Sequence, residues 1–181
     1  MQYLVVRFWV AMIEANFYVE IPIILDIEAS GFGRGSYPIE IGVALPDGSL
    51  HIWLLKPPAQ WQHWQPEAEQ VHGITREQLA REGLPLDQVA TELNRLLVGK
   101  TVYSDGWGVD RTWLALMFHE ADMLQGFNLD TIYGLLDEAQ MDQWEASRES
   151  VLEKTGMVPH RAGTDALIIQ KTYLYAKGVQ I

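Results

Sequence analysis

The pattern of apolar and polar positions predicts three strands at the start of the folded chain. Residues 21–27 form a short apolar run rich in isoleucine, which favours a buried strand. A glycine-rich turn leads to a second strand over residues 39–45, and turn residues then lead to a third strand over residues 50–56. Strands joined by such short connections form an antiparallel meander.

After the meander the apolar period becomes that of helices. We expect an irregular connection over residues 57–70, a strand over residues 101–104 and several helices. The expected helices lie at residues 76–81, 86–97, 109–121, 131–136, 137–154 and 162–177. A meander followed by alternating helices and strands indicates one α/β domain, with a mixed sheet flanked by helices.

We assign this single domain to residues 20–181 and treat residues 1–19 as a leader of uncertain status. Arg7 and Glu14 interrupt the leader, so it is too short and too charged to span a membrane. It also lacks the basic start of a secretory signal, and we expect a cytoplasmic protein without membrane association. Two interpretations stay open: an extra element packed on the domain, or a leader that is not native.

Composition excludes several classes of protein. The 181 residues are 48% hydrophobic and 20% charged, which is ordinary for a globular domain and excludes a disordered chain. The absence of cysteine excludes disulfides, zinc–thiolate sites and a cysteine nucleophile. The chain has 24 acidic and 13 basic side chains, so its net charge is −11. This charge argues against a protein that binds long duplex DNA by electrostatic attraction alone.

Two acids stand at the end of the first predicted strand. Because side chains alternate along a strand, Asp26 and Glu28 share one face while Ile27 points to the other. Such a pair suggests a neutralising cation, and a chain without cysteine offers mainly the oxygen ligands that Mg²⁺ and Mn²⁺ take. On its own, Asp-x-Glu is more often a pair of surface acids.

Further candidates stand near the starts of two predicted helices. Asp110 lies in a first helical turn, where a carboxylate also stabilises the helix dipole. Asp105, just before it, is a neighbouring candidate or a plain turn residue. Asp165 falls on a partly inward face of the last helix, where a carboxylate needs a partner or a metal. His160 precedes that helix and either reaches the same site or is an exposed loop histidine, as we expect for His51, His63 and His119.

In this order and context, the five residues Asp26, Glu28, Asp110, His160 and Asp165 resemble the motifs of the DEDDh 3′–5′ exonucleases. That group includes the proofreading subunit of bacterial replicative polymerase, oligoribonuclease and ribonuclease T. The resemblance covers residues 21–176 and implies a ribonuclease H-like fold. Four residues separate the histidine from the last aspartate, as in the histidine branch of the family.

A further segment and two departures refine the resemblance. Residues 71–75, Val-His-Gly-Ile-Thr, are similar to a segment common in the group. Residues 104–106 are Ser-Asp-Gly, where the family often has His-Asn-Ala. Residues 29–31 are Ala-Ser-Gly, where Thr-Thr-Gly or Ala-Thr-Gly is commoner. The departures affect the expected substrate contacts more than the acids.

The resemblance implies phosphodiester hydrolysis with two Mg²⁺ or Mn²⁺ ions. Asp26 would bridge the ions, Glu28 and Asp165 would complete one of them, and Asp110 would hold the other mostly through water. His160 would be the general base, a role suited to a side chain whose ordinary pKa is about 6.5. Contacts to the terminal nucleotide would come from two segments, Ala29, Ser30 and Gly31, and His72, Gly73, Ile74 and Thr75.

We therefore predict a metal-dependent exonuclease acting on the 3′ ends of single-stranded or short nucleic acid, with DNA and RNA both open. Trp61 and Trp64, in the long connection, are expected to pack rather than to stack on bases. Two alternatives remain: a catalytically weak accessory module of a polymerase or repair complex, and another hydrolase on the same scaffold. Several relatives dimerise, so a homodimer stays open.

Overall fold

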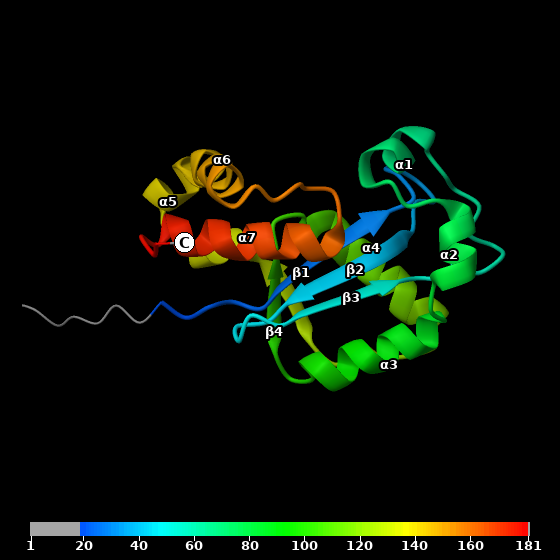
Figure 1. The fold of residues 1–181 in the computed structure, drawn as a ribbon. Helices are drawn as coiled ribbons and strands as arrows, with labels where there is room; N and C mark the ends of the chain where they lie inside the picture. The colour runs from blue at the N-terminus through cyan, green and yellow to red at the C-terminus, as the bar shows by residue number, and fades with distance from the viewer. Residues whose placement is uncertain (1–18, 181) are drawn as a thin grey trace, which may run out of the picture.

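The computed structural model describes residues 19–180, so the predicted leader lies outside the described residues except for Val19. The centre of the fold is a five-stranded sheet in the order β3-β2-β1-β4-β5 (Figure 1). Strands β1, β2 and β3 are antiparallel, whereas β4 pairs parallel to β1 and β5 pairs parallel to β4. The predicted meander and mixed sheet are confirmed. The strands span Ile24–Ala29, Pro38–Ala44, Leu50–Leu54, Thr101–Ser104 and Asn128–Thr131.

Helices cover both faces of this sheet. Helix α7 lies along β1 and β2 on one face with α6 packed against it, and α3 and α4 cover the other face (Figure 1). All seven residues of β2 are buried because helices lie on both of its sides. The helices are α1 (Pro66–His72), α2 (Arg76–Glu82), α3 (Leu86–Leu97), α4 (Trp107–Glu120), the 3₁₀ helix η1 (Ile132–Leu135), α5 (Glu138–Asp142), α6 (Trp144–Thr155) and α7 (Ala162–Ala176).

Two elements were not expected from the sequence, and the helix expected over residues 137–154 is divided at Gln143 into α5 and α6. Helix α1 lies within the connection that we expected to be irregular, and it buries only His72, so no apolar period marks it. Strand β5 has four residues and none of them is fully buried, so it lacks the apolar alternation of a strand. Trp61 is buried against Tyr37 with ring centroids 5.1 Å apart, and Trp64 packs on the same core, as expected.

A glycine lets α7 approach the sheet closely. Gly42 stands opposite Asp26 in the β1–β2 ladder. A Cβ atom at Gly42 would overlap the backbone of Ala162 and Gly163, so the first turn of α7 rests directly on β2. This contact brings the acids of β1 beside the acid in the first turn of α7.

No helix in residues 19–180 has both the length and the apolar character needed to cross a membrane.

Candidate active site

A cavity of about 480 Å³ opens at the carboxyl end of β1, between α1 and α4. Its floor carries Asp26 and Glu28 from β1, and Asp110 from α4 and His160 from the α6–α7 connection also line it. Four of the five residues of the DEDDh pattern therefore face one space. The fifth, Asp165, lies beside them in the first turn of α7.

Three carboxylates converge at this place. One oxygen each of Asp26, Glu28 and Asp165 lie within 4.8 Å of one another. The Oδ2 atom of Asp165 accepts a hydrogen bond of 2.7 Å from the backbone N–H of His160. Its Oδ1 atom is buried and has no hydrogen-bond partner within the described part of the chain. An unpartnered buried oxygen beside two other carboxylates fits the donor set that a hard divalent cation takes.

Burial raises the pKa values of these acids, and neighbouring negative charges add to the effect for Asp26 and Glu28. Burial raises the pKa of Asp26 well above its ordinary value, and the charges of Asp110 and Asp165 raise it further. Burial, followed by the neighbouring charge of Asp165, raises the pKa of Glu28 to about 7. Burial also raises the pKa of Asp165. The cluster therefore holds protons near neutral pH that a bound cation would displace.

Asp110 forms the opposite wall of the cavity. It is 3% exposed, and burial raises its pKa to about 7 although Ser104 donates a hydrogen bond to its Oδ2 atom. Ser104, in the segment that departs from the family pattern, thus holds this carboxylate in place. Asp105 is close enough for its charge to raise the pKa of Asp26, and its own pKa is raised by burial. Asp105 is not among the three carboxylates that converge.

His160 is exposed to the cavity and has an unusual backbone. Its φ angle is 77°, in the left-handed region that side-chain-bearing residues rarely adopt. The hydrogen bond from its N–H to Asp165 ties this conformation to the carboxylate cluster. The imidazole is therefore placed next to the acids by the first turn of α7.

Two charged residues at the site were not predicted from the sequence. Glu40 in β2 lies opposite Glu28 in the ladder and is completely buried. It accepts two hydrogen bonds from Nε of Arg161, of 3.0 and 3.2 Å, one from Nη2 of the same residue, and one of 2.9 Å from the N–H of Ala162. An acid inside the apolar run of β2 is the sequence signal that indicates a buried ion pair.

Some of the residues predicted to contact the substrate line the cavity, and the others do not. Ala29, Gly31 and His72 line the cavity. Ser30 does not, since it is 1% exposed and its Oγ accepts a hydrogen bond from the N–H of Tyr37. Three others are not among the lining residues: Gly73 ends α1, Ile74 is fully buried, and Thr75 caps α2.

His72 presents an unpaired donor. Its Nδ1 atom accepts a 3.0 Å hydrogen bond from the N–H of Ile74, so the neutral ring carries its proton on Nε2. His72 is 5% exposed, and Nε2 is buried with no partner within residues 19–180. Burial lowers the pKa of His72, which keeps the ring neutral.

Apolar side chains surround the mouth of the cavity. Phe32, Val71 and Val109 line it and are 70%, 55% and 46% exposed. The Phe32 ring lies 6.3 Å from that of Trp113, which also lines the cavity. The described residues that line this cavity include no Lys or Arg. We call Phe32, Val71, Val109 and Trp113 the apolar collar.

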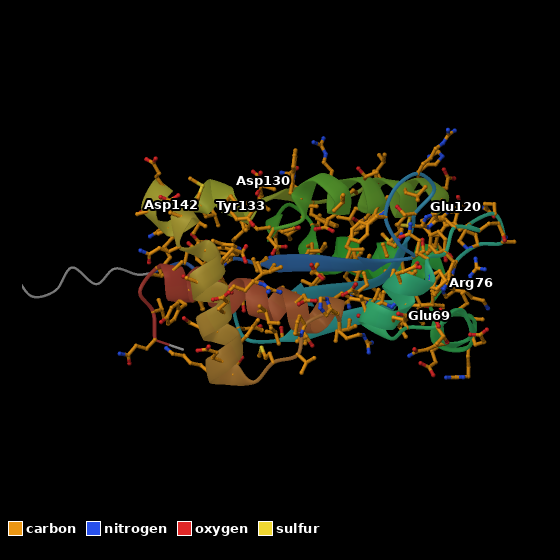
Figure 2. The ribbon with its side chains drawn as sticks, turned by 90° about the horizontal axis from the view of Figure 1, so that it is seen from above. Glu69, Arg76, Glu120, Asp130, Tyr133 and Asp142 are labelled. Carbon is orange, nitrogen blue, oxygen red and sulfur yellow. The ribbon has the colours of Figure 1, made fainter. Side chains whose placement is uncertain are left out.

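The wall formed by α1 is held from outside the cavity. Trp64 donates a 2.7 Å hydrogen bond to Glu69, and the guanidinium of Arg76 lies 5.3 Å above the Trp64 ring. Glu69 and Arg76 lie at one end of the molecule, and Tyr133 and Asp142 lie at the other (Figure 2). The site therefore occupies one end of the sheet.

Comparison with known proteins identifies the fold. No family model matches the sequence, and no curated protein is detectably similar to it in sequence. Among solved structures, exonuclease I from Methylocaldum szegediense matches with a TM-score of 0.63 at 16% identity, over 84% of this chain and 39% of that one. Exonuclease I from E. coli in complex with a dA16 oligonucleotide matches with a TM-score of 0.63 at 12% identity, over 86% of this chain and 41% of that one.

A third structure, of SSB/exonuclease I in complex with the inhibitor CFAM, matches with a TM-score of 0.65 at 13% identity, over 87% of this chain and 41% of that one. This chain spans about two fifths of the length of these exonuclease I chains. At such identities the likeness establishes the fold. The ribonuclease H-like prediction is confirmed, and the described chain has the α/β fold found in exonuclease I.

Proposed function

We propose that the protein is a metal-dependent 3′–5′ exonuclease that hydrolyses phosphodiester bonds at the 3′ ends of single-stranded or short nucleic acid. The observation that carries this proposal is the meeting of Asp26, Glu28 and Asp165 within 4.8 Å, with one buried oxygen unpartnered, beside His160. The fold shared with exonuclease I supports it. Residues 20–181 are proposed as a single exonuclease-like domain.

The proposed roles follow from where each side chain lies. Asp26, Glu28 and Asp165 would hold one Mg²⁺ or Mn²⁺ ion, and Asp26 with Asp110 would hold a second. Two such ions stabilise the charge that develops on the phosphorus and on the departing 3′ oxygen. His160 accepts the proton of the attacking water, because its exposed imidazole lies at the cavity next to the acids.

The apolar collar is proposed to receive the terminal bases. Aromatic and aliphatic side chains bind bases by stacking, with about 1–3 kcal/mol per base and little sequence preference. His72 also lines the cavity and is proposed to contact the sugar or phosphate of the terminal nucleotide. Ala29 and Gly31 provide backbone that a nucleotide can approach closely.

Charge favours a short or single-stranded substrate. Leaving out the four metal-site acids takes 24 acidic side chains to 20, still against 13 basic ones. Long duplexes are bound mainly by Lys and Arg side chains that neutralise their phosphates. No Lys or Arg is among the described residues that line the cavity, so we propose that base stacking and the metal ions bind the substrate instead. E. coli exonuclease I is known in complex with a dA16 oligonucleotide, which supports an oligonucleotide substrate here.

The test is digestion of 5′-labelled DNA and RNA oligonucleotides of matched sequence, with Mn²⁺ and with excess EDTA. We expect a ladder of products shortened from the 3′ end, with 5′-monophosphates released and no activity in EDTA. Asp26→Asn serves as the inactive control. Equal degradation of a 3′-blocked or circular strand would contradict the proposed direction, and binding without hydrolysis would favour the accessory-module alternative.

A further inference from the structure

We propose that Glu40 and Arg161 are positioning residues that hold His160 and Asp165 in their working places at the cavity. This inference rests on the proposed function, because it assigns the pair a role in the same reaction. We call the ion pair and its hydrogen bond to Ala162 the Glu40–Arg161 clamp. Neither Glu40 nor Arg161 is itself among the residues that line the cavity, so we assign them a role through the lining residues beside them.

The clamp joins the sheet to the loop that carries the histidine. Glu40 has no exposed surface, whereas the Arg161 side chain is 46% exposed. A buried carboxylate without a partner is strongly unfavourable, so Glu40 requires both the guanidinium and the N–H of Ala162. These bonds anchor two consecutive residues directly after His160, Arg161 through its side chain and Ala162 through its backbone N–H.

His160 needs such support because of its backbone conformation. Within residues 19–180, only Asp122 and His160 are non-glycine residues with positive φ. A side-chain-bearing residue stays in this region only where its surroundings hold it there. On one side the N–H of His160 donates to Asp165, and on the other side Arg161 is bound to Glu40.

The same clamp caps the helix that carries Asp165. No side chain of the α7 segment itself caps this helix within the described structure, and Glu40 accepts the N–H of Ala162 instead. The N–H of Asp165 donates to the carbonyl of Arg161 at 2.9 Å. Glu40 also stands directly across the ladder from Glu28. A single buried side chain, on the strand next to Glu28, therefore links the sheet to the His160 loop and to the helix that carries Asp165.

A double-mutant cycle separates positioning from general stability. Arg161→Gln is expected to lower kcat for mononucleotide release by about 10²-fold, since small misplacements of a reacting group cost that much, and to change KM little. Arg161→Lys keeps the charge without the forked geometry, so it should retain more of the rate. At saturating Mn²⁺, which offsets a weakened Asp165 ligand, Arg161→Gln in a His160→Ala background should lower kcat further by no more than about twofold.

The matched control is Arg81→Gln in α2. This substitution removes an exposed ion pair, in which Nη2 of Arg81 lies 2.6 Å from Oε1 of Glu82, and it should leave kcat unchanged. Equal losses from Arg161→Gln with and without His160, together with an unchanged affinity for Mn²⁺, would overturn the inference, because they would show that the clamp acts neither through the histidine nor through Asp165. If Arg161→Gln does not fold, Arg161→Lys takes its place in the cycle.

Amide hydrogen exchange tests the clamp without activity. In metal-free protein, Arg161→Gln is expected to speed exchange at the amides of His160 and Asp165, whereas Arg81→Gln is not. Unchanged exchange at both amides would overturn the inference. If the wild-type protein releases no nucleotide, the proposed function fails, and this measurement alone decides whether the clamp holds the loop.

Discussion

The affinity of the site for divalent cations should rise steeply with pH. The pKa of Glu28 and that of Asp110 are both raised to about 7, mainly by burial. Each carboxyl group then goes from about 9% ionised at pH 6 to about 91% at pH 8. The fraction of molecules with both groups ionised rises from about 1% to about 80%. Because each of the two ions is held by one of these groups in its ionised form, the apparent Kd of each ion should fall roughly tenfold over this range, and the affinity for both ions together should rise roughly 100-fold.

Calorimetric titration with Mn²⁺ at pH 6, 7 and 8 measures this directly. At pH 7 the two half-protonated groups should together release about one proton per protein molecule that binds both ions, which buffers of different ionisation enthalpy detect. Glu28→Gln should reduce the pH dependence. Asp142→Asn, an exposed acid at the opposite end of the molecule from Glu69 (Figure 2), is the matched control and should not. A Kd that is flat between pH 6 and 8 would refute the reasoning.

The same pKa shifts have a consequence for the metal-free protein. Between the ordinary pKa of Glu28, 4.5, and the folded value of about 7, the native state binds more protons than the unfolded state. Stability of the metal-free protein must therefore fall as pH rises through this window, by roughly 3 kcal/mol for this group. A Tm of the metal-free protein that rises from pH 5 to pH 7 would contradict this sign.

Four substitutions test other parts of the site. His160→Ala should lower kcat about 10²–10⁴-fold in single-turnover assays while leaving Mn²⁺ affinity intact, whereas Asp165→Asn should weaken Mn²⁺ binding as well; a near-normal kcat in His160→Ala would make it an ordinary loop residue. Gly42→Ala should push α7 away from β2, which should lower the free energy of unfolding in urea by about 1–3 kcal/mol and also weaken metal binding. An unchanged free energy of unfolding would contradict this. Phe32→Ala, at a 70% exposed position, should raise KM without lowering Tm, and an unaltered KM would remove it from the collar.

Much of the fold could be predicted from the sequence because its central strands have strong local patterns. The isoleucine-rich run of β1 and the turn before β3 mark strands without knowledge of the rest of the chain. Strand β5 and helix α1 could not be found in this way. Each is short and mostly exposed, so its conformation depends on the neighbours that it packs against rather than on its own apolar period.

The acids of the site could be predicted for the same reason, since strand and helix periods place Asp26, Glu28 and Asp165. The clamp could not, because Glu40 and Arg161 are 121 positions apart in sequence and only the fold brings them together. The apolar collar was also missed. An exposed Phe32 or Val71 looks like any core residue in a sequence, and only its exposure beside the acids shows another use.

The most direct test of the account is to locate Mn²⁺ by anomalous scattering in crystals soaked with Mn²⁺ and a nucleoside 5′-monophosphate. We predict one peak bound by Asp26, Glu28 and Asp165, and a second on the Asp110 side of Asp26, about 3.5–4 Å from the first. The base should lie against the apolar collar. Peaks remote from these carboxylates, or none at saturating Mn²⁺ above pH 7, would contradict the central claim that this acid cluster is a metal-dependent nuclease site.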